Sequence, residues 1–409
     1  MASQPERIVV VGAGHAGLQL CASLRQEGFQ GSVVLVNNEA VAPYQRPPLS
    51  KAYLTGKLDE LALQFRPSKF YTDNGIELIF DQALSIDRAG QRVILRDGEA
   101  LRYDHLVLAT GTHNRPLPVP GVDLDGVSGI KSLADARLLA PALQSTTDAV
   151  VVGAGFIGLE FAAVARDAGV RVHVIDLADR PMARAVTPAM SEFFRREHER
   201  SGVSFDFGQG LSHLLGKEGR VSEALTSNGH RFAAQLVVYG IGVVPNVSLA
   251  ADAGLAIGNG IRVNEFLLSS DPSISAIGDV AAFPIASSAD YMRLESVQNA
   301  TDQARCVAAR LCGRPAAYAA LPWFWTDQGD LKLQIAGIGS GTDHTVCVGN
   351  VEAKQFSLLC FREDHLVAVE SVNRAGDHMA ARKILSKSIP LTPAEAASPT
   401  FDFKSWAAR

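Results

Sequence analysis

One glycine-rich pattern, G-x-G-x-x-G, occurs twice in this chain of 409 residues, at 12–17 and at 153–158. Each copy follows an apolar, strand-like run, 8–11 and 149–152, and precedes an apolar stretch typical of a helix. Strand, glycine loop and helix form the context in which this pattern grips a pyrophosphate at a helix N-terminus. Two copies predict two bound dinucleotides, and a flavin with a nicotinamide is the simplest pair.

Composition narrows the class of protein. The chain is 47% hydrophobic and 20% charged, so it can bury the cores of two or three domains. Its net charge of −5 argues against a nucleic-acid partner. The first strand-like run begins close to Met1, and no long apolar run follows, so we expect a cytoplasmic protein with no membrane partner.

The second copy carries a coenzyme signal. Asp176 ends the strand-like run 172–175, about 20 residues after the loop, where a carboxylate accepts a bond from a ribose hydroxyl. It would also repel a 2′-phosphate, which favours NADH over NADPH. The alternatives are an ordinary solvated Asp at a strand end, or a phosphate received by Arg180 and Arg184.

In the first copy, the two residues that follow the corresponding strand-like run are not acidic. The run 33–36 is followed by Asn37, Asn38 and Glu39. An Asn can both donate to and accept from a ribose without carrying charge, and Glu39 is a substitute candidate.

Five segments together resemble a known family. They are 43–51, 153–160, 278–281, 295–300 and 322–328, and the most specific are Arg-Pro-Pro-Leu-Ser-Lys and Pro-Trp-Phe-Trp-Thr-Asp-Gln. They are similar to the FAD-dependent, NADH-oxidising ferredoxin reductases of bacterial cytochrome P-450 and ring-hydroxylating dioxygenase systems. The resemblance covers nearly the whole chain in the right order.

The resemblance implies an α/β fold with two Rossmann-like dinucleotide-binding domains, in a glutathione-reductase-like architecture, plus a C-terminal α+β domain. The FAD-binding domain would comprise residues 1–112 and 246–322, the NADH-binding domain 113–245, and the C-terminal domain 323–409.

It also implies site residues. Those for FAD are Gly12, Gly14, Ala16, Gly17, Asn38, Arg46, Lys51, Leu84, Ala109, Gly111, Lys131, Gly278, Asp279, Val297 and Trp325. Those for NADH are Gly153, Gly155, Ile157, Gly158, Asp176 and Gly242. Asn38 is the clearest departure, because the family tends to have an acid there. No metal site is predicted.

Lys51 and Glu160 would form an ion pair close to flavin N5. A cation there stabilises an anionic reduced flavin, and a carboxylate holds the cation in place. The alternatives are a surface lysine and a glutamate favoured by the helix dipole. The aromatic run 323–325 would cover the flavin or line an electron exit, or else belong to a core.

The positions of the cysteines restrict the electron route. Five occur, none in a C-x-x-C pair, and residues 22–305 contain none. A thiol route beside the flavin is therefore excluded, and electrons must leave to a one-electron carrier or to oxygen. We expect the five to be buried small hydrophobic residues in a reducing compartment.

The resulting hypothesis is an NADH-dependent reductase that passes electrons through FAD to a [2Fe–2S] ferredoxin, as a monomer or weak homodimer. Rubredoxin reductase and NADH oxidase are alternatives, and an NADH-sensing flavoprotein of the apoptosis-inducing-factor type is one of another class. A basic docking patch at Arg305, Arg310 and Arg314 competes with an ordinary solvated helical face.

Overall fold

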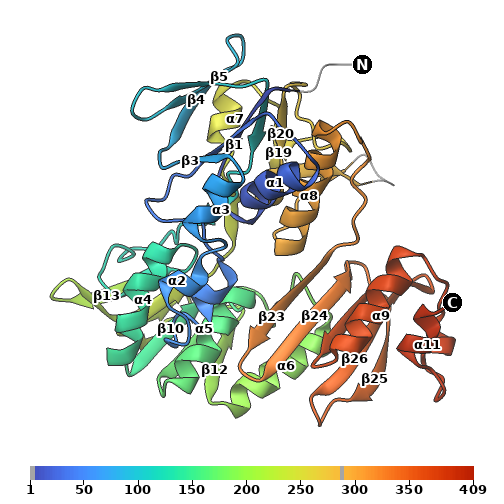
Figure 1. Ribbon diagram of the computed structural model, residues 1–409. Coiled ribbons are helices and arrows are strands. Elements are labelled where there is room, and N and C mark those ends of the chain that lie inside the picture. The colour runs from blue at the N-terminus through green and yellow to red at the C-terminus, as the bar shows by residue number, and fades with distance from the viewer. Residues whose placement is uncertain (1–4, 286–289) are drawn as a thin grey trace. The chain divides into compact units, whose positions relative to one another are not determined.

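The computed structural model describes residues 5–285 and 290–409, which form two compact units (Figure 1). Of the described residues, unit 1 comprises 5–45, 60–113, 243–285 and 290–320, and unit 2 comprises 46–59, 114–242 and 321–409.

Unit 1 is built on a parallel five-stranded sheet of order β20-β7-β1-β2-β3. The central strands are buried and rich in Val, Ile and Leu, as parallel strands covered on both faces are. Helix α1 packs against α8. The bounds are β1 Arg7–Val11, β2 Ser32–Val36, β3 Ile76–Ile79, β7 His105–Leu108, β20 Ile274–Ala276, α1 His15–Gln26 and α8 Val297–Leu311.

Smaller elements complete unit 1. They are α2 Glu60–Leu63, α3 Ser68–Asp73, α7 Ser248–Asp252, η2 Gly278–Val280, β4 Ala83–Asp87, β5 Arg92–Leu95, β6 Ala100–Arg102, β8 Thr112–Asn114, β17 Val243–Pro245, β18 Ile257–Gly258, β19 Gly260–Arg262, β21 Ala281–Pro284 and β22 Tyr291–Met292.

Unit 2 contains a second parallel sheet of the same kind, of order β12-β11-β10-β16-β9. The bounds are β9 Val127–Gly129, β10 Asp148–Val152, β11 Arg171–Asp176, β12 Val203–Phe207, β16 Leu236–Tyr239, α4 Leu133–Ser145, α5 Phe156–Asp167 and α6 Pro188–Arg200. The antiparallel strands β13 Leu211–Lys217, β14 Arg220–Thr226 and β15 Arg231–Ala233 and the short helix η1 Pro47–Ser50 belong to the same unit.

The C-terminal part of unit 2 is an antiparallel sheet of order β23-β24-β27-β26-β25, against which α9 packs. The bounds are β23 Trp323–Gln328, β24 Leu331–Gly337, β25 His344–Asn350, β26 Gln355–Arg362, β27 His365–Val372, α9 Ala375–Ser386, α10 Pro393–Ala396 and α11 Phe403–Ala407. The predicted fold class, two Rossmann-like sheets plus an α+β part, is confirmed.

The two glycine loops share one backbone geometry. Gly12 has a φ of +109° and Gly153 a φ of +105°, a region that favours glycine. A Cβ at Gly12 would lie 2.3 Å from the carbonyl oxygen of Ala109, and one at Gly153 would lie 2.6 Å from that of Gly240. Each loop therefore lies so close to the end of a neighbouring strand that only glycine fits. This shared geometry supports an internal duplication of the strand–loop–helix unit.

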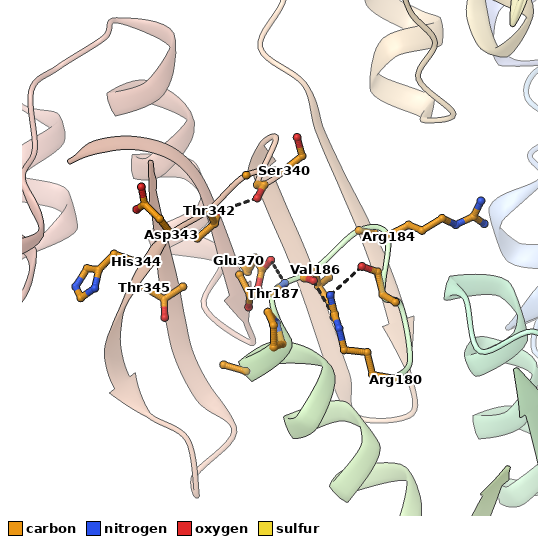
Figure 2. Close-up of a pocket in the computed structure, with 16 residues that line it drawn as sticks. Arg180, Arg184, Val186, Thr187, Ser340, Thr342, Asp343, His344, Thr345 and Glu370 are labelled. Carbon is orange, nitrogen blue, oxygen red and sulfur yellow. Dashed lines mark hydrogen bonds between the residues drawn. The ribbon is translucent and has the colours of Figure 1, made fainter. Parts of the chain in front are cut away.

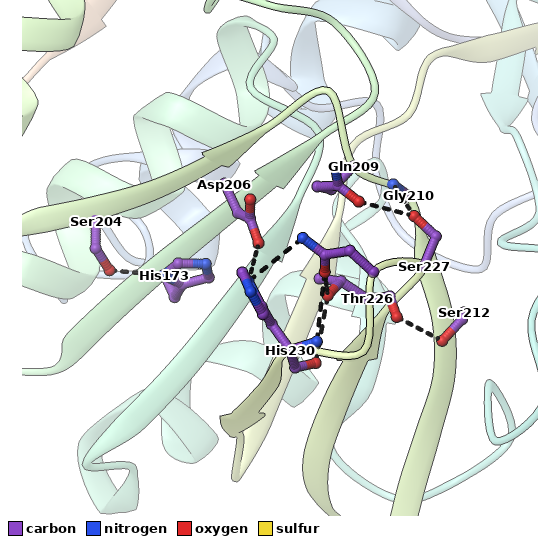
Figure 3. Close-up of polar contacts among 10 residues, drawn as sticks. His173, Ser204, Asp206, Gln209, Gly210, Ser212, Thr226, Ser227 and His230 are labelled. Carbon is purple, nitrogen blue, oxygen red and sulfur yellow. Dashed lines mark hydrogen bonds and ion pairs between the residues drawn. The ribbon is translucent and has the colours of Figure 1, made fainter.

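A polar cluster joins the hairpin strands of unit 2 to its parallel sheet (Figure 3). His173 on β11 stacks on Phe232 of β15 with 3.6 Å between ring centroids, and its Nδ1 lies 2.7 Å from Ser204 Oγ. His230 Nδ1 lies 3.1 Å from Asp206 Oδ2. Burial lowers the pKa of His173 to about 4, so this ring packs as a neutral aromatic group.

A buried carboxylate fixes the start of α6 (Figure 2). Thr187 is the N-cap of α6, and its hydroxyl accepts a bond from Met190 N at 3.3 Å. The same hydroxyl donates to Glu370 Oε2 at 2.7 Å, and Thr187 N donates to Oε1 at 2.8 Å. Glu370 is 1% exposed, and this burial raises its pKa to about 7 from the ordinary 4.5, although the Thr187 donors oppose the rise.

We expect Glu370 to make stability fall as the pH rises from 4.5 to 7. In that window the folded protein holds a proton that the unfolded chain has released, so the free energy of unfolding decreases with pH. Glu370→Gln should flatten this slope when thermal unfolding midpoints are measured between pH 4.5 and 8. The exposed Glu352→Gln is the matched control. An unchanged slope in Glu370→Gln would contradict the assignment.

Candidate active site

The segment Arg-Pro-Pro-Leu-Ser-Lys forms the short helix η1, with Pro47 and Pro48 at the positions where proline suits a helix start. Leu49 and Ser50 are buried, and Lys51 follows at the end of the helix. Helix η1 packs against α5, the helix that leaves the second glycine loop. A local turn therefore presents Ser50 and Lys51 to α5.

Glu160 lies on the buried side of α5 and is 3% exposed. Its Oε1 accepts from Lys51 Nζ at 2.8 Å and from Thr326 Oγ1 at 2.7 Å, and its Oε2 accepts from Ser50 Oγ at 2.6 Å. Leaving a buried charge unpaired costs roughly 3–5 kcal/mol, whereas a hydrogen bond to a charged group contributes about 1.5–3 kcal/mol. Three donors are therefore enough to hold this carboxylate in place.

Lys51 is neither a free surface lysine nor fully enclosed. Its side chain is 21% exposed, and Nζ also donates to the carbonyl oxygen of Pro47 at 3.4 Å. The alternative of a surface lysine is thus wrong for Lys51. Glu160 does not merely face the helix dipole, because it accepts bonds from three side chains. The Lys51 side chain therefore remains partly exposed while its ammonium is held by Glu160.

Two of the donors to Glu160 were not singled out from the sequence. Ser50 and Thr326 are small hydroxyl residues inside the two most specific motifs, the segments 46–51 and 322–328. The motifs marked them, but only the fold reveals that both hydroxyls donate to one carboxylate.

The aromatic run on β23 is partly buried and packs against neighbouring side chains. The rings of Trp323 and Trp325 lie 5.8 Å apart and tilted, and Arg382 stacks over Trp323 at 4.4 Å. Phe324 faces the other way and meets Phe156 of α5 edge to face at 4.8 Å. The strand thus packs one ring against α5 and leaves the other two partly buried.

Both glycine loops have room for a phosphate. The N-caps of α1 and α5 are Gly14 and Gly155, and neither helix has a side-chain cap. A Cβ on Gly14 would meet nothing within 4 Å, and one on Gly155 only the Gly240 carbonyl oxygen at 3.9 Å. Uncapped N–H groups beside open space suit a pyrophosphate, so each loop fits a dinucleotide. Ile157, at the start of α5, is 42% exposed.

Two further candidates of unit 1, Gly278 and Ala109, lie near its glycine loop. A Cβ on Gly278, whose φ is +75°, would lie 3.0 Å from Ala16 Cβ, so η2 with Asp279 approaches the start of α1. Val297 is the first residue of α8. Ala109 is buried, and it touches Gly12 as described above. Gly111 follows with a φ of +62°, and Leu84 is 51% exposed on β4.

In the turn after β2, two of the three candidate side chains already have hydrogen-bond partners within the protein. Asn37 is buried, and its Nδ2 donates to the Val41 carbonyl oxygen at 2.8 Å. Glu39 Oε2 accepts from the Tyr44 hydroxyl at 2.6 Å. Asn38 is exposed. Of the three residues, Asn38 is the one whose side chain faces solvent.

Two basic candidates of unit 2 meet at α4. Arg46 Nη1 donates to the Lys131 carbonyl oxygen at 3.0 Å, and Lys131 N donates to Asp135 Oδ2 at 2.9 Å. The Asp135 carboxylate belongs to the capping box of α4. The Arg46 guanidinium is therefore held against the backbone of Lys131, and that backbone is in turn held by Asp135.

Asp176 has a structural task that the sequence did not reveal. One carboxylate oxygen accepts from Ala154 N in the second glycine loop, and the other accepts from Ala178 N at 2.8 Å. Each oxygen keeps a further lone pair for a ribose hydroxyl. Asp176 is thus not simply a solvated strand-end residue.

The two arginines after Asp176 have different surroundings. Arg180 is tied to its own loop through the carbonyl oxygens of Val186 and Ala183 at 3.1 and 2.9 Å. A Cβ on Gly242, whose φ is +101°, would lie 3.6 Å from Arg184 Nη2. Arg184 therefore reaches toward the predicted NADH residue Gly242, whereas Arg180 stabilises the fold.

A cavity of about 550 Å³ adjoins Thr187 and Glu370, with Ser340, Thr342 and Asp343 on its other side (Figure 2). The residues predicted to hold FAD or NADH do not line it, but Arg180 and Arg184, the alternative phosphate partners, do. It is separate from the arrangement around Glu160.

The hypothesis of a basic patch on α8 is not supported. Arg310 donates to Ser275 Oγ at 2.6 Å and is only partly exposed. Arg305 pairs with Asp302, and Arg314 pairs with Glu27. Arg305 and Arg314 thus stay exposed but are paired with carboxylates, Arg310 is partly buried, and Arg314 lies beyond the end of α8.

The expectation of buried cysteines is correct for two of the five. Cys21 and Cys360 are buried, Cys306 and Cys312 are partly exposed, and Cys347 is exposed on β25. Cys347 differs because β25 is the edge strand of its sheet, so one side of the strand faces solvent.

Comparison with known proteins identifies the family. Residues 6–304 match the pyridine nucleotide-disulphide oxidoreductase family, and residues 323–407 match the reductase C-terminal family. The chain therefore belongs to the pyridine nucleotide-disulphide oxidoreductases. Within the residues that the structure describes, no helix is long and apolar enough to cross a membrane.

Individual relatives narrow this assignment. The chain is 48% identical to rhodocoxin reductase of Rhodococcus erythropolis, covering 97% of this chain and 93% of the relative. A ferredoxin reductase for the CYP199A2 system from Rhodopseudomonas palustris has a TM-score of 0.97 at 48% identity, covering 98% of this chain and 100% of that one. Putidaredoxin reductase, in a covalent complex with putidaredoxin, has a TM-score of 0.95 at 37% identity, covering 98% of both chains.

The predicted resemblance is thus confirmed. The chain is an oxidoreductase of the FAD- and NAD(H)-dependent ferredoxin reductase type.

Proposed function

We propose that this protein transfers electrons from NADH, through FAD, to a small [2Fe–2S] ferredoxin that supplies a cytochrome P-450 monooxygenase or a ring-hydroxylating dioxygenase. The observation that carries the proposal is the ion pair between Lys51, at the end of η1, and buried Glu160 of α5, the helix that leaves the second glycine loop. Bound FAD supplies the chemistry of accepting two electrons from NADH and releasing them singly.

The role of Lys51 follows from charge. An ammonium held at a fixed place stabilises negative charge that develops on a bound group, because a preorganised charge costs no rearrangement during the reaction. Glu160 fixes the ammonium at 2.8 Å, and Ser50 and Thr326 fix Glu160. Together, Glu160, Ser50 and Thr326 therefore fix the position of the Lys51 ammonium.

The second glycine loop would hold NADH through Gly153, Gly155, Ile157, Gly158 and Gly242, with Asp176 on the adenosine ribose. The first would hold FAD through Gly12, Gly14, Ala16 and Gly17, with Asn38 on its ribose and Asp279 and Val297 near the flavin. Arg46, Lys51, Lys131 and Trp325 are the remaining proposed FAD contacts. The open space at Gly14 and Gly155 supports this division.

The cysteines favour a one-electron acceptor. Residues 22–305 contain no cysteine, and burial raises the pKa of Cys21 to about 12, so it is a poor nucleophile. Electrons therefore cannot leave through a thiol near the glycine loops. The partly buried rings of Trp323 and Trp325 are the proposed exit for electrons.

The partner is proposed from chemistry and from relatives. A putidaredoxin reductase of 37% identity forms a complex with putidaredoxin, which supports an iron–sulfur partner of that kind here. We propose a monomer or weak homodimer, and a cytoplasmic location because NADH is an intracellular coenzyme.

A panel of acceptors tests the function. The FAD-loaded protein should oxidise NADH much faster with [2Fe–2S] ferredoxins than with rubredoxin or oxygen alone, measured as steady-state NADH consumption. Preference for rubredoxin would identify a rubredoxin reductase. Rapid turnover with oxygen alone would identify an oxidase. A long-lived reduced flavin–NAD complex with poor turnover would identify a sensor.

Coenzyme choice tests Asp176. NADH should exceed NADPH by at least about 10-fold in kcat/KM, because the carboxylate repels a 2′-phosphate. Asp176→Asn should narrow this gap while keeping an oxygen for the loop contact with Ala154 N. Steady-state kinetics with both coenzymes checks this, and Asp179→Asn serves as a nearby control. Equal use of both coenzymes by the unaltered protein would refute the assignment.

Removing the charge of Lys51 tests the pair. Lys51→Met should slow flavin reduction by NADH at least about 10-fold and lower the flavin reduction potential, because the reduced state loses a nearby cation. Stopped-flow anaerobic reduction and a dye-equilibrated potential measure both effects. The exposed Lys57→Met is the matched control. If Lys51→Met changes neither quantity, Lys51 does not lie beside the flavin.

A further inference from the structure

The carboxylate of Glu160 is the end of a longer chain of buried hydrogen bonds. Thr326 Oγ1 donates to Glu160 Oε1 at 2.7 Å, and Gln328 Nε2 donates to Thr326 Oγ1 at 3.3 Å. His198 Nε2 lies 2.7 Å from Gln328 Oε1. The chain thus runs from α5 through β23 to α6.

Every member of this chain is shielded from solvent. Glu160, Thr326, Gln328 and His198 are 3%, 0%, 2% and 4% exposed. Buried polar groups satisfy their hydrogen bonds within the protein, so the direction of each bond depends on its neighbour.

His198 sets that direction. Burial lowers the pKa of His198, so the ring is neutral and carries one N–H. When Nε2 holds the proton, it donates to Gln328 Oε1, and the Gln328 amide nitrogen must face Thr326 and Met182, whose Sδ is 3.6 Å away. Because Thr326 Oγ1 then accepts, its own hydroxyl proton points to Glu160.

The opposite arrangement would have a different effect. If the other ring nitrogen carried the proton, Gln328 would turn its nitrogen to His198 and its oxygen to Thr326. The Thr326 hydroxyl would then donate to Gln328 and no longer to Glu160. The carboxylate oxygen that binds Lys51 would lose its second donor.

We propose that Thr326 and Gln328 are positioning residues for the Lys51–Glu160 pair, and that the Nε2–H form of His198 fixes the direction of their hydrogen bonds. Thr326 and Lys51 share Oε1, so the Thr326 bond determines how strongly that oxygen draws the ammonium. This inference rests on the proposed role of Lys51 beside the flavin.

The first test removes one hydroxyl. Thr326→Val keeps the shape of the side chain but donates nothing, so Glu160 should draw Lys51 more tightly and away from the flavin. Flavin reduction by NADH should slow at least about 10-fold, and the potential should become more negative. Thr326→Ser restores the hydroxyl and should restore both values. Equal behaviour of the Val and Ser variants would overturn the proposal.

The second test reverses a bond without touching Thr326. Gln328→Glu places two acceptor oxygens beside Thr326, so the Thr326 hydroxyl should donate to the new carboxylate and leave Glu160. We expect a potential shifted in the same direction as in Thr326→Val. A potential equal to that of the unaltered protein would contradict the directional chain, and this variant remains informative if Thr326→Val fails to fold.

A measurement without flavin tests His198 directly. In FAD-free protein, ¹⁵N NMR of the His198 ring should report a neutral imidazole with its proton on Nε2. A proton on Nδ1 would overturn the proposed direction.

Two controls separate this inference from the proposed function. Thr226→Val removes a hydroxyl that is equally buried, at 2% exposure, but bonds Asn228, so it should change thermal stability without changing the potential. If Lys51→Met shifts the potential while Thr326→Val behaves like Thr226→Val, the inference fails alone. If Lys51→Met has no effect, the proposed function of the pair fails.

Discussion

A buried carboxylate must be met by hydrogen-bond donors, and Glu160 obtains its donors from two other segments of the chain. Ser50 and Lys51 come from η1, and Thr326 comes from β23, more than 160 residues further on than Glu160. The packing of α5 against η1 and β23 therefore has an electrostatic requirement as well as an apolar one. Any rearrangement of these three elements would leave a charge buried without partners, which is strongly unfavourable.

Local features of the fold could be predicted from the sequence because their causes are local. The strand–loop–helix units follow from glycines that adopt a positive φ or allow close approach, and the parallel strands follow from short runs of Val, Ile and Leu. The β23 segment was recognised as distinctive for a similar reason, since its aromatic residues adjoin a Thr and a Gln in one motif. The pairing of Lys51 with Glu160 came only from family resemblance, since spacing along the chain contains no information about it.

Side-chain partners that lie far apart in the chain could not be predicted from the sequence. Arg310 bonds Ser275 and Glu370 bonds Thr187, and both partners lie far away in the chain. The hypothesis of a basic patch counted charges on one helix and could not include the side chains that neutralise them. The exposed Cys347 has the same origin, because the order of strands in the C-terminal sheet decides which strand is at the edge.

The two glycine loops differ in the residue that follows the neighbouring strand. Gly12 N donates to the Val36 carbonyl oxygen at 2.9 Å, and Gly153 N donates to that of Ile175 at 2.8 Å, so Asn37 is the structural counterpart of Asp176.

Asn37 turns away to bind the Val41 carbonyl oxygen, whereas Asp176 binds the backbone of the second loop at Ala154. In the second unit one carboxylate therefore supports the loop and, in the proposed function, also selects the coenzyme. Loop geometry and coenzyme preference are thus coupled through Asp176. A substitution that removes both oxygens of Asp176 changes both together, whereas Asn38 is exposed and can be altered with less effect on its loop.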